Sequence, residues 1–121
     1  MLGLRRSGPD TKLVLLINLD ANKPGAQERE VASIAASPGP VYLRVMIDAK
    51  SLCQFAYSFD HQKFTAIGEP FQATVDRWIG AKLGLIATAS SDAAKAGHAD
   101  FDWFHVIPGH PLGQSFNPWP R

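Results

Sequence analysis

The segment "HADFDWFHVIP", residues 98–108, combines two aspartates and two histidines with aromatic side chains. If this stretch is extended, His98, Asp100 and Asp102 project from one face, because side chains alternate along a strand. The two carboxylates would then have Cβ atoms about 6.5–7 Å apart, from a rise of about 3.3 Å per residue. That separation lies near the lower limit for inverting glycosidases. However, catalytic pairs flank their substrate from two sides, whereas these carboxylates would point in parallel.

Three interpretations of the two aspartates therefore stay open. They could act as a catalytic pair, or Asp100 and Asp102 could hold calcium, which takes oxygen ligands but needs more of them than this segment supplies. They could also be hydrogen-bond acceptors in a structural strand, since polar groups in folded proteins are generally paired. The sequence favours the structural strand, and apart from calcium we expect no cofactor.

Aromatic residues give a second candidate chemistry, the stacking of sugar rings on Tyr42, Trp78 and Trp103. The alternative is core packing, because aromatic side chains contribute much of the buried area of a small domain. For Trp103 we favour the core. Trp78 stands between "TVDR" and "IGAK", at a loop-to-strand junction where an exposed aromatic commonly serves binding.

Other catalytic and metal-binding patterns are missing from the sequence. It contains no GxSxG, GxGxxG or GxxxxGK[ST] motif. Its four histidines have no HxH or HxxxH spacing. The single cysteine, Cys53, can form neither an internal disulfide nor a zinc site, and its apolar surroundings predict a buried thiol. We therefore expect no enzymatic activity from the chain by itself.

Charge and hydropathy exclude several classes of partner. The formal net charge is +1, with acids and bases mixed along the chain, so no basic stripe for nucleic acid is present. The longest apolar run, at 13–19, is too short to cross a bilayer. The N-terminus lacks the charged start and long apolar region of a signal peptide, which makes the cytoplasm the default compartment.

The arrangement of apolar residues predicts an all-β fold. Short runs rich in β-branched and aromatic residues are separated by turns rich in Gly, Pro, Asn and Asp, among them "IGEP" at 67–70. The segment at 26–37 is the best helix candidate, although its apolar spacing also fits a strand. We expect strands near residues 2–6, 12–19, 29–35, 41–49, 52–59, 64–67, 82–88 and 99–107. Frequent turns between short strands favour an antiparallel sandwich over residues 1–108, followed by an irregular tail at 109–121.

Several of these segments, in this order and spacing, resemble the C-terminal concanavalin A-like domain of glycoside hydrolase family 43 β-xylosidases and arabinofuranosidases. The matching pieces span residues 41–106, and residues 2–33 resemble the preceding strands more loosely. The pieces are "VYLRV", "FAYSFD", "FTAIGEPF", "IGAKLGL" and "ADFDWFHV". The resemblance implies a jelly-roll, concanavalin A-like β-sandwich that begins before Met1 and is incomplete here.

The resemblance also implies a function. In that family the catalytic carboxylates lie on a preceding five-bladed propeller, so the sandwich is a non-catalytic accessory domain in the breakdown of xylan and arabinoxylan oligosaccharides. An aromatic residue of the sandwich helps to shape the substrate pocket of the propeller, and Trp78 occupies that position, where the family usually has Phe. The family's hairpin turn often reads Asp-Gly. Here His61 follows Asp60, which favours another turn type, since positive φ is strained for a residue other than glycine.

A sandwich that lacks strands exposes edges and an apolar face, so we expect self-association or pairing with a partner chain. The expected partners are a family 43 propeller and an oligosaccharide. The alternative function is a free-standing lectin-like carbohydrate-binding module or a structural interaction module. An exposed aromatic platform around Trp78, Tyr42 or Trp103 would favour the binding module.

Overall fold

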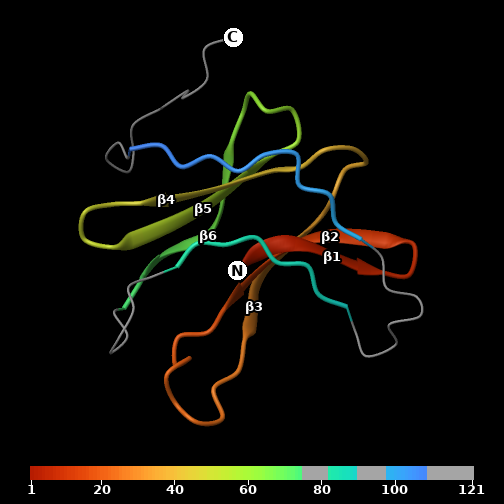
Figure 1. Cartoon of the computed structure of the whole chain (residues 1–121). Coiled ribbons are helices and arrows are strands. Elements are labelled where there is room, and N and C mark those ends of the chain that lie inside the picture. Colours follow the sequence, from red (N-terminus) through yellow and green to blue (C-terminus); the bar gives the residue numbers. More distant parts are fainter. Residues whose placement is uncertain (75–81, 90–97, 109–121) are drawn as a thin grey trace.

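The computed structural model describes residues 1–74, 82–89 and 98–108, and within these ranges the chain is all-β (Figure 1). Its antiparallel strands form two three-stranded sheets, of order β1-β2-β3 and β4-β5-β6. The strands are β1 (Leu2–Ser7), β2 (Asp10–Ile17), β3 (Arg29–Ala35), β4 (Tyr42–Ile47), β5 (Leu52–Ser58) and β6 (Thr65–Gln72). The predicted all-β architecture is confirmed, and it is that of an incomplete β-sandwich. No helix in the described ranges is long and apolar enough to span a membrane.

The core lies between the two sheets and is centred on β2. Leu13 and Leu15 project from one face of β2, are fully buried, and contact Ile67 of β6. Phe55 and Tyr57 of β5 pack against the same cluster. Phe55 and Tyr57 therefore share the face of β5 that meets the other sheet.

The strand β6 extends further than the sequence predicts, through the expected turn at 67–70. Its register with β5 shifts between the pairs Phe55–Ile67 and Cys53–Phe71, so a bulge takes up the extra residues. Gly68 lies in this bulge at φ 67°. A Cβ atom there would collide with Leu15 Cδ2, so glycine allows the two sheets to approach each other.

The ambiguous segment at 26–37 forms the strand β3 and no helix. The register between β2 and β3 shifts between Leu15 and Leu16, so that Val31 is an additional residue opposite β2. Tertiary pairing decides this segment, because its weak helical period cannot compete with a ladder to the most buried strand.

Burial of the inward-facing side chains decreases toward the edge strands β1 and β4. Leu4 of β1 lies opposite the buried Leu13, yet it is exposed. Leu43 and Ile47 of β4 lie on the same face of the sheet as the core residues of β5, yet both are exposed. The sandwich is therefore open along the side formed by these two edges.

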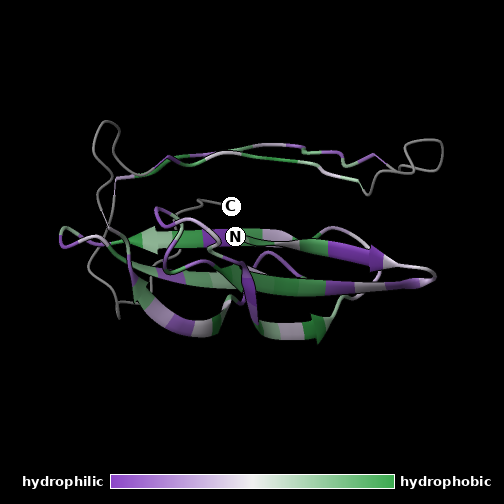
Figure 2. Cartoon of the chain, turned by 90° about the horizontal axis from the view of Figure 1, so that it is seen from below, coloured by the Kyte–Doolittle hydropathy of each residue, from purple (hydrophilic) through white to green (hydrophobic). Residues whose placement is uncertain are grey.

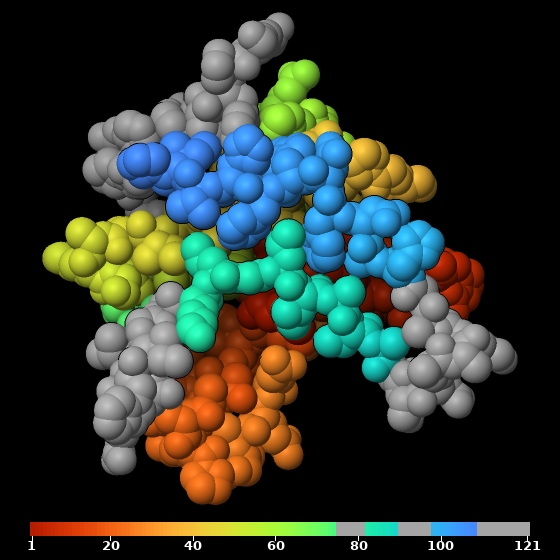
Figure 3. All heavy atoms as spheres, viewed as in Figure 1, coloured from red at the N-terminus to blue at the C-terminus, as the bar shows by residue number. Residues whose placement is uncertain are grey.

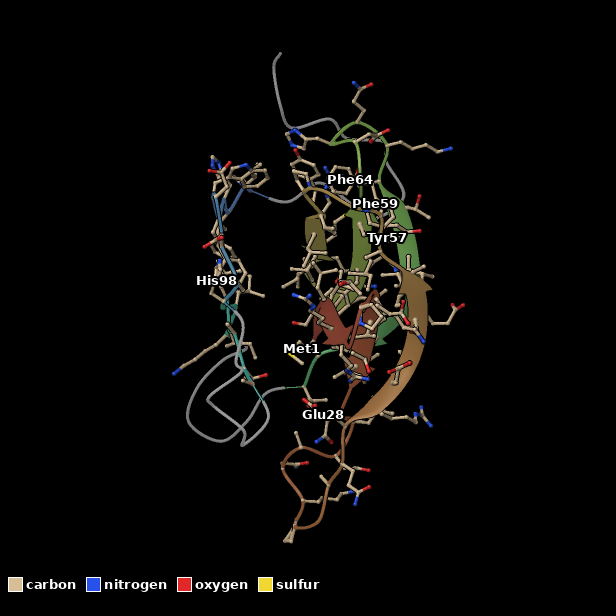
Figure 4. All side chains as sticks on the ribbon, turned by 90° about the vertical axis from the view of Figure 1, so that its right-hand side faces the viewer. Met1, Glu28, Tyr57, Phe59, Phe64 and His98 are labelled. Carbon is tan, nitrogen blue, oxygen red and sulfur yellow. The ribbon has the colours of Figure 1, made fainter. Side chains whose placement is uncertain are left out.

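Residues 82–89 and 98–108 lie outside the two sheets as extended stretches, which we call the outer layer (Figure 2). Figure 4, turned by 90°, shows the same separation from the strands. The prediction of strands at 82–88 and 99–107 is wrong, because neither stretch forms a ladder. Apolar alternation predicts extended backbone, but a strand also requires a hydrogen-bonded neighbour. The predicted tail at 109–121 lies outside the described residues.

Candidate carbohydrate-contact site

The turn between β5 and β6 is organised by Asp60. Its Oδ1 accepts hydrogen bonds from the backbone N–H of Gln62 at 2.8 Å and of Lys63 at 2.9 Å, and from the Ser58 hydroxyl at 2.8 Å. These bonds, those of Lys63 and Gln62 above all, stabilise the carboxylate and lower the pKa of Asp60 to about 2. Asp60 thus opens the turn by accepting backbone N–H groups, which is a common role of aspartate in turns.

His61 follows Asp60 and adopts φ 63°, in the left-handed region. The expectation of a turn without positive φ at this position is wrong. Histidine is among the residues that tolerate this region best after glycine. Its ring stacks on Tyr42 of β4, with ring centroids 4.3 Å apart and an interplanar angle of 12°. The stack and the Asp60 hydrogen bonds together hold the turn in this conformation.

Trp103 of the outer layer completes an aromatic cluster with these two rings. Its ring centroid lies 6.2 Å from that of Tyr42 and 5.7 Å from that of His61. His105, two residues further on, meets the Trp103 ring edge to face at 5.0 Å. We name these four residues, Tyr42, His61, Trp103 and His105, the ring cluster.

The ring cluster brings together two of the three predicted sugar-contact residues, Tyr42 and Trp103. It corrects the preference for Trp103 as a core residue, since that residue is 41% exposed. Sequence reasoning missed both histidines as members of a site. The spacing of His105 two residues after Trp103 was the available signal, because it places both rings on one side of an extended segment.

Partly exposed rings of this kind can make two types of contact. Their faces offer apolar area, and the polar atoms of tyrosine, tryptophan and histidine offer hydrogen bonds at the ring edges. Three segments that are distant in sequence supply the rings: β4, the β5–β6 turn and the outer layer. Such convergence of aromatic and polar groups is typical of sites for small polar ligands.

The acidic residues of the outer layer are largely exposed to solvent. The side chain of Asp100 is 91% exposed, and its Oδ2 is 3.4 Å from His98 Nε2. Asp102 is also exposed. Within residues 1–74, 82–89 and 98–108, no group of three or more His, Cys, Asp or Glu side chains is placed to hold a metal ion. Calcium typically takes six to eight oxygen ligands, which include backbone carbonyls and water as well as carboxylates.

Two further sequence predictions concern single residues. Trp78 lies outside the described residues. Cys53 is buried, as predicted, and burial raises the pKa of its thiol, so it is protonated at neutral pH. A buried thiol of this kind is unreactive, which agrees with its expected structural role.

The family comparison gives a match over residues 1–107, to the model described as the beta xylosidase C-terminal concanavalin A-like domain. The chain belongs to this family. Domains of the family are non-catalytic parts of family 43 glycoside hydrolases, which agrees with the absence of a catalytic motif from the sequence. Neither the comparison with curated proteins nor that with solved structures gives a match. The match covers residues 82–89 and all but the last residue of 98–108, so both stretches of the outer layer belong to the family domain as much as the six strands do.

Proposed function

We propose that this beta xylosidase C-terminal domain is the accessory domain of a family 43 glycosidase and supplies aromatic contacts to xylan- or arabinoxylan-derived oligosaccharides. The ring cluster carries this proposal. Its rings are held by a stack at 4.3 Å and by the hydrogen-bonded Asp60 turn, while Trp103 stays 41% exposed. A ring fixed before binding loses little conformational entropy when a sugar stacks on it.

The partner in this proposal is a family 43 catalytic propeller, whose substrate pocket the domain helps to shape. Trp78 is the residue proposed to reach that pocket, because it precedes "IGA" as the family aromatic does. The ring cluster would act in addition to Trp78, by holding the more distant sugar units. Binding energy gained on distant units can be used to position the bond that is cleaved.

Calorimetric titration of the chain with xylo-oligosaccharides tests the sugar contact. A few stacked units correspond to a dissociation constant on the order of 1 mM, or about −4 kcal/mol. Trp103→Ala should abolish the binding heat. Phe104→Ala is the matched control, since it removes a neighbouring exposed ring that is not a member of the ring cluster. Equal binding by both variants, or no binding by the unaltered chain, would count against the proposed contact.

The absence of catalysis has its own test on nitrophenyl xyloside. The chain should hydrolyse nothing, because the two candidate catalytic carboxylates, Asp100 and Asp102, lie on the same extended stretch and both are exposed. Hydrolysis that is lost in Asp100→Asn or Asp102→Asn would overturn the accessory role.

The alternative function is a free-standing lectin-like module, which the exposed ring cluster would also suit. The two functions differ in their dependence on the propeller. An accessory domain should raise kcat/KM of a separately produced family 43 propeller when it is added in trans, and Trp78→Ala should reduce that gain. A lectin-like module should bind sugar equally well alone and leave the kinetics of the propeller unchanged.

A further inference from the structure

Arg44 of β4 differs from the other basic residues of the described part of the chain. The other lysines and arginines within residues 1–74, 82–89 and 98–108 are exposed, whereas Arg44 is half-buried. Its guanidinium Cζ lies 3.5 Å from the centroid of the Phe64 ring, in a cation–π contact. Burial lowers the pKa of Arg44 from its ordinary 12.5, but an arginine side chain stays protonated in proteins. The sheet therefore holds a permanent positive charge at this position.

The strands determine the path of the Arg44 side chain. Arg44 lies directly opposite Ala56 of β5, so both side chains project from the same face of the sheet. Because Ala56 is small, the Arg44 side chain has room to extend over β5 toward Phe64, which immediately precedes β6. The contact with the Phe64 ring then orients the planar guanidinium, whose N–H donors lie around the edge of the plane.

No protein group in the described ranges uses these N–H donors. Arg5 is paired with Glu30 at 2.7 Å, but Arg44 makes no hydrogen bond or ion pair with any residue that the structure describes. Asp60, the acidic residue nearest to Phe64 in sequence, is committed to its turn, where its Oδ1 accepts three hydrogen bonds. A half-buried, oriented guanidinium with available donors is suited to an acceptor from outside the chain.

Arg44 lies on the same face of β4 as the ring cluster. Tyr42 precedes it by two residues in a strand whose register with β5 is uninterrupted, so the two Cβ atoms are about 6.5–7 Å apart on one face. Figure 3 shows residues 98–108, which carry Trp103, next to the β5–β6 turn on this side of the molecule. A ligand that stacks on the ring cluster can therefore place a neighbouring group at Arg44.

The chemistry of the two features together indicates the kind of ligand. The planar fork of an arginine matches a carboxylate or a phosphate through paired hydrogen bonds. Aromatic faces such as those of Tyr42 and Trp103 add contact area for the ring of a sugar. A free phosphate uses only the first feature and an uncharged sugar only the second. A sugar that carries a carboxylate, a uronic acid, uses both.

We propose that Arg44 and the ring cluster form a subsite for a uronic acid, so that the preferred ligand is a xylo-oligosaccharide with a uronic acid branch. The carboxylate of the branch pairs with the Arg44 guanidinium while a neighbouring sugar ring stacks on Trp103. This inference rests on the proposed sugar contact and adds the substrate class.

Calorimetric titration of the full chain with two ligands tests it: a xylo-oligosaccharide that carries a glucuronic acid branch, and the same backbone without the branch. We expect the acidic ligand to bind about tenfold more tightly, as a hydrogen bond to a charged group provides. Arg44→Gln should remove this advantage and leave the affinity for the neutral ligand unchanged. Arg44→Lys should keep only part of the advantage, because lysine retains the charge but lacks the planar fork.

Arg29→Gln is the matched control, since Arg29 is an exposed arginine on β3, in the other sheet. It should keep the full preference for the acidic ligand. Raising the salt concentration from about 0.05 to about 0.5 M should reduce the preference in the unaltered chain, because salt screens the charge pair. Far-ultraviolet circular dichroism of each variant should match that of the unaltered chain.

Equal affinity of the unaltered chain for the two ligands would overturn the inference and leave the proposed sugar contact intact. A preference that survives Arg44→Gln would also overturn it, as would equally tight binding of inorganic phosphate. Binding of the acidic ligand that is lost in Arg44→Gln but kept in Trp103→Ala would instead uphold the carboxylate contact and count against stacking on the ring cluster.

A carboxylate of the propeller is the other acceptor that the guanidinium would fit. In that case Arg44→Gln would reduce the gain in kcat/KM that the domain gives a propeller on a neutral substrate, and the chain would show no preference between the two ligands. That result would overturn the uronic acid subsite.

Discussion

Two segments with nearly the same sequence have opposite environments in this molecule. In β2, "LVLLI" places Leu13 and Leu15 at 0% exposure. In the outer layer, "LGLI" carries Leu83 and Leu85 with the same spacing, at 51% and 48% exposure. β2 is the central strand of its sheet, with β1 and β3 hydrogen-bonded on either side. Leucines at alternate positions therefore encode an extended backbone, whereas their burial depends on which neighbouring strands are present.

The largest effect expected from this comparison is on stability. Leu15→Ala should lower the free energy of unfolding by about 2–5 kcal/mol, because it leaves a cavity between the two sheets. Leu85→Ala should cost less than about 1 kcal/mol, since surface substitutions have small effects. Urea denaturation followed by tryptophan fluorescence or circular dichroism gives both values.

Similar losses for the two alanine variants would mean that the outer layer is packed as tightly as β2. The comparison would then be wrong, and the apolar side chains of residues 82–89 would belong to a closed core.

The approach of β6 to β2 gives the second effect. Gly68→Ala combines positive φ with a clash against the buried Leu15, and should cost about 2–4 kcal/mol. Gly25→Ala is the matched control, because Gly25 has φ 78° but open space around its Cβ position. It should cost only the backbone term of about 1–2 kcal/mol. Equal melting temperatures of the two variants would show that the sheets do not touch at Gly68.

The outer layer contacts the strands at the turn that Asp60 organises. The effect on stability expected from this turn is smaller. Because the pKa of Asp60 is about 2 when folded against an ordinary 3.8, its contribution to stability is fully present above pH 4. That contribution is lost as the pH falls through about 2. Carbon NMR of the Asp60 carboxyl group should show this low midpoint.

Ser58→Ala removes one donor to the carboxylate and should raise the Asp60 pKa part of the way toward 3.8. The shift is partial because the N–H groups of Lys63 and Gln62 remain as donors. An unshifted midpoint near 3.8 in the unaltered chain would show that the turn does not hold His61 as described.

The sequence predicted the six strands of the body well because local pattern and tertiary environment agree there. Five of the six have bounds close to those expected, and the buried state of Cys53 was also correct. β6 was predicted too short, since Gly and Pro within "IGEP" indicate a turn in isolation. Only the register with β5 shows that they form a bulge.

The ring cluster could be predicted only in part. Tyr42 and Trp103 were recognised as aromatic candidates, but their proximity depends on the path of the outer layer across the strands. His61 was missed because its positive φ is stabilised by the Tyr42 stack, which is a contact between distant segments. A rule that considers only residues adjacent in sequence cannot predict such a contact.

The smallest expected effect concerns calcium and the outer layer. Asp100 and Asp102 were proposed from sequence as calcium ligands, and His98 Nε2 lies 3.4 Å from Asp100 Oδ2. Two exposed carboxylates bind calcium weakly, because most of its ligands would remain water. We therefore expect a calcium chelator to change the melting temperature by less than about 1 °C, since a site that is not preformed contributes little to folding stability. A larger drop that is absent in Asp100→Asn would mean that calcium orders the outer layer. The outer layer would then differ from β2 by binding a metal as well as by lacking hydrogen-bonded strand neighbours.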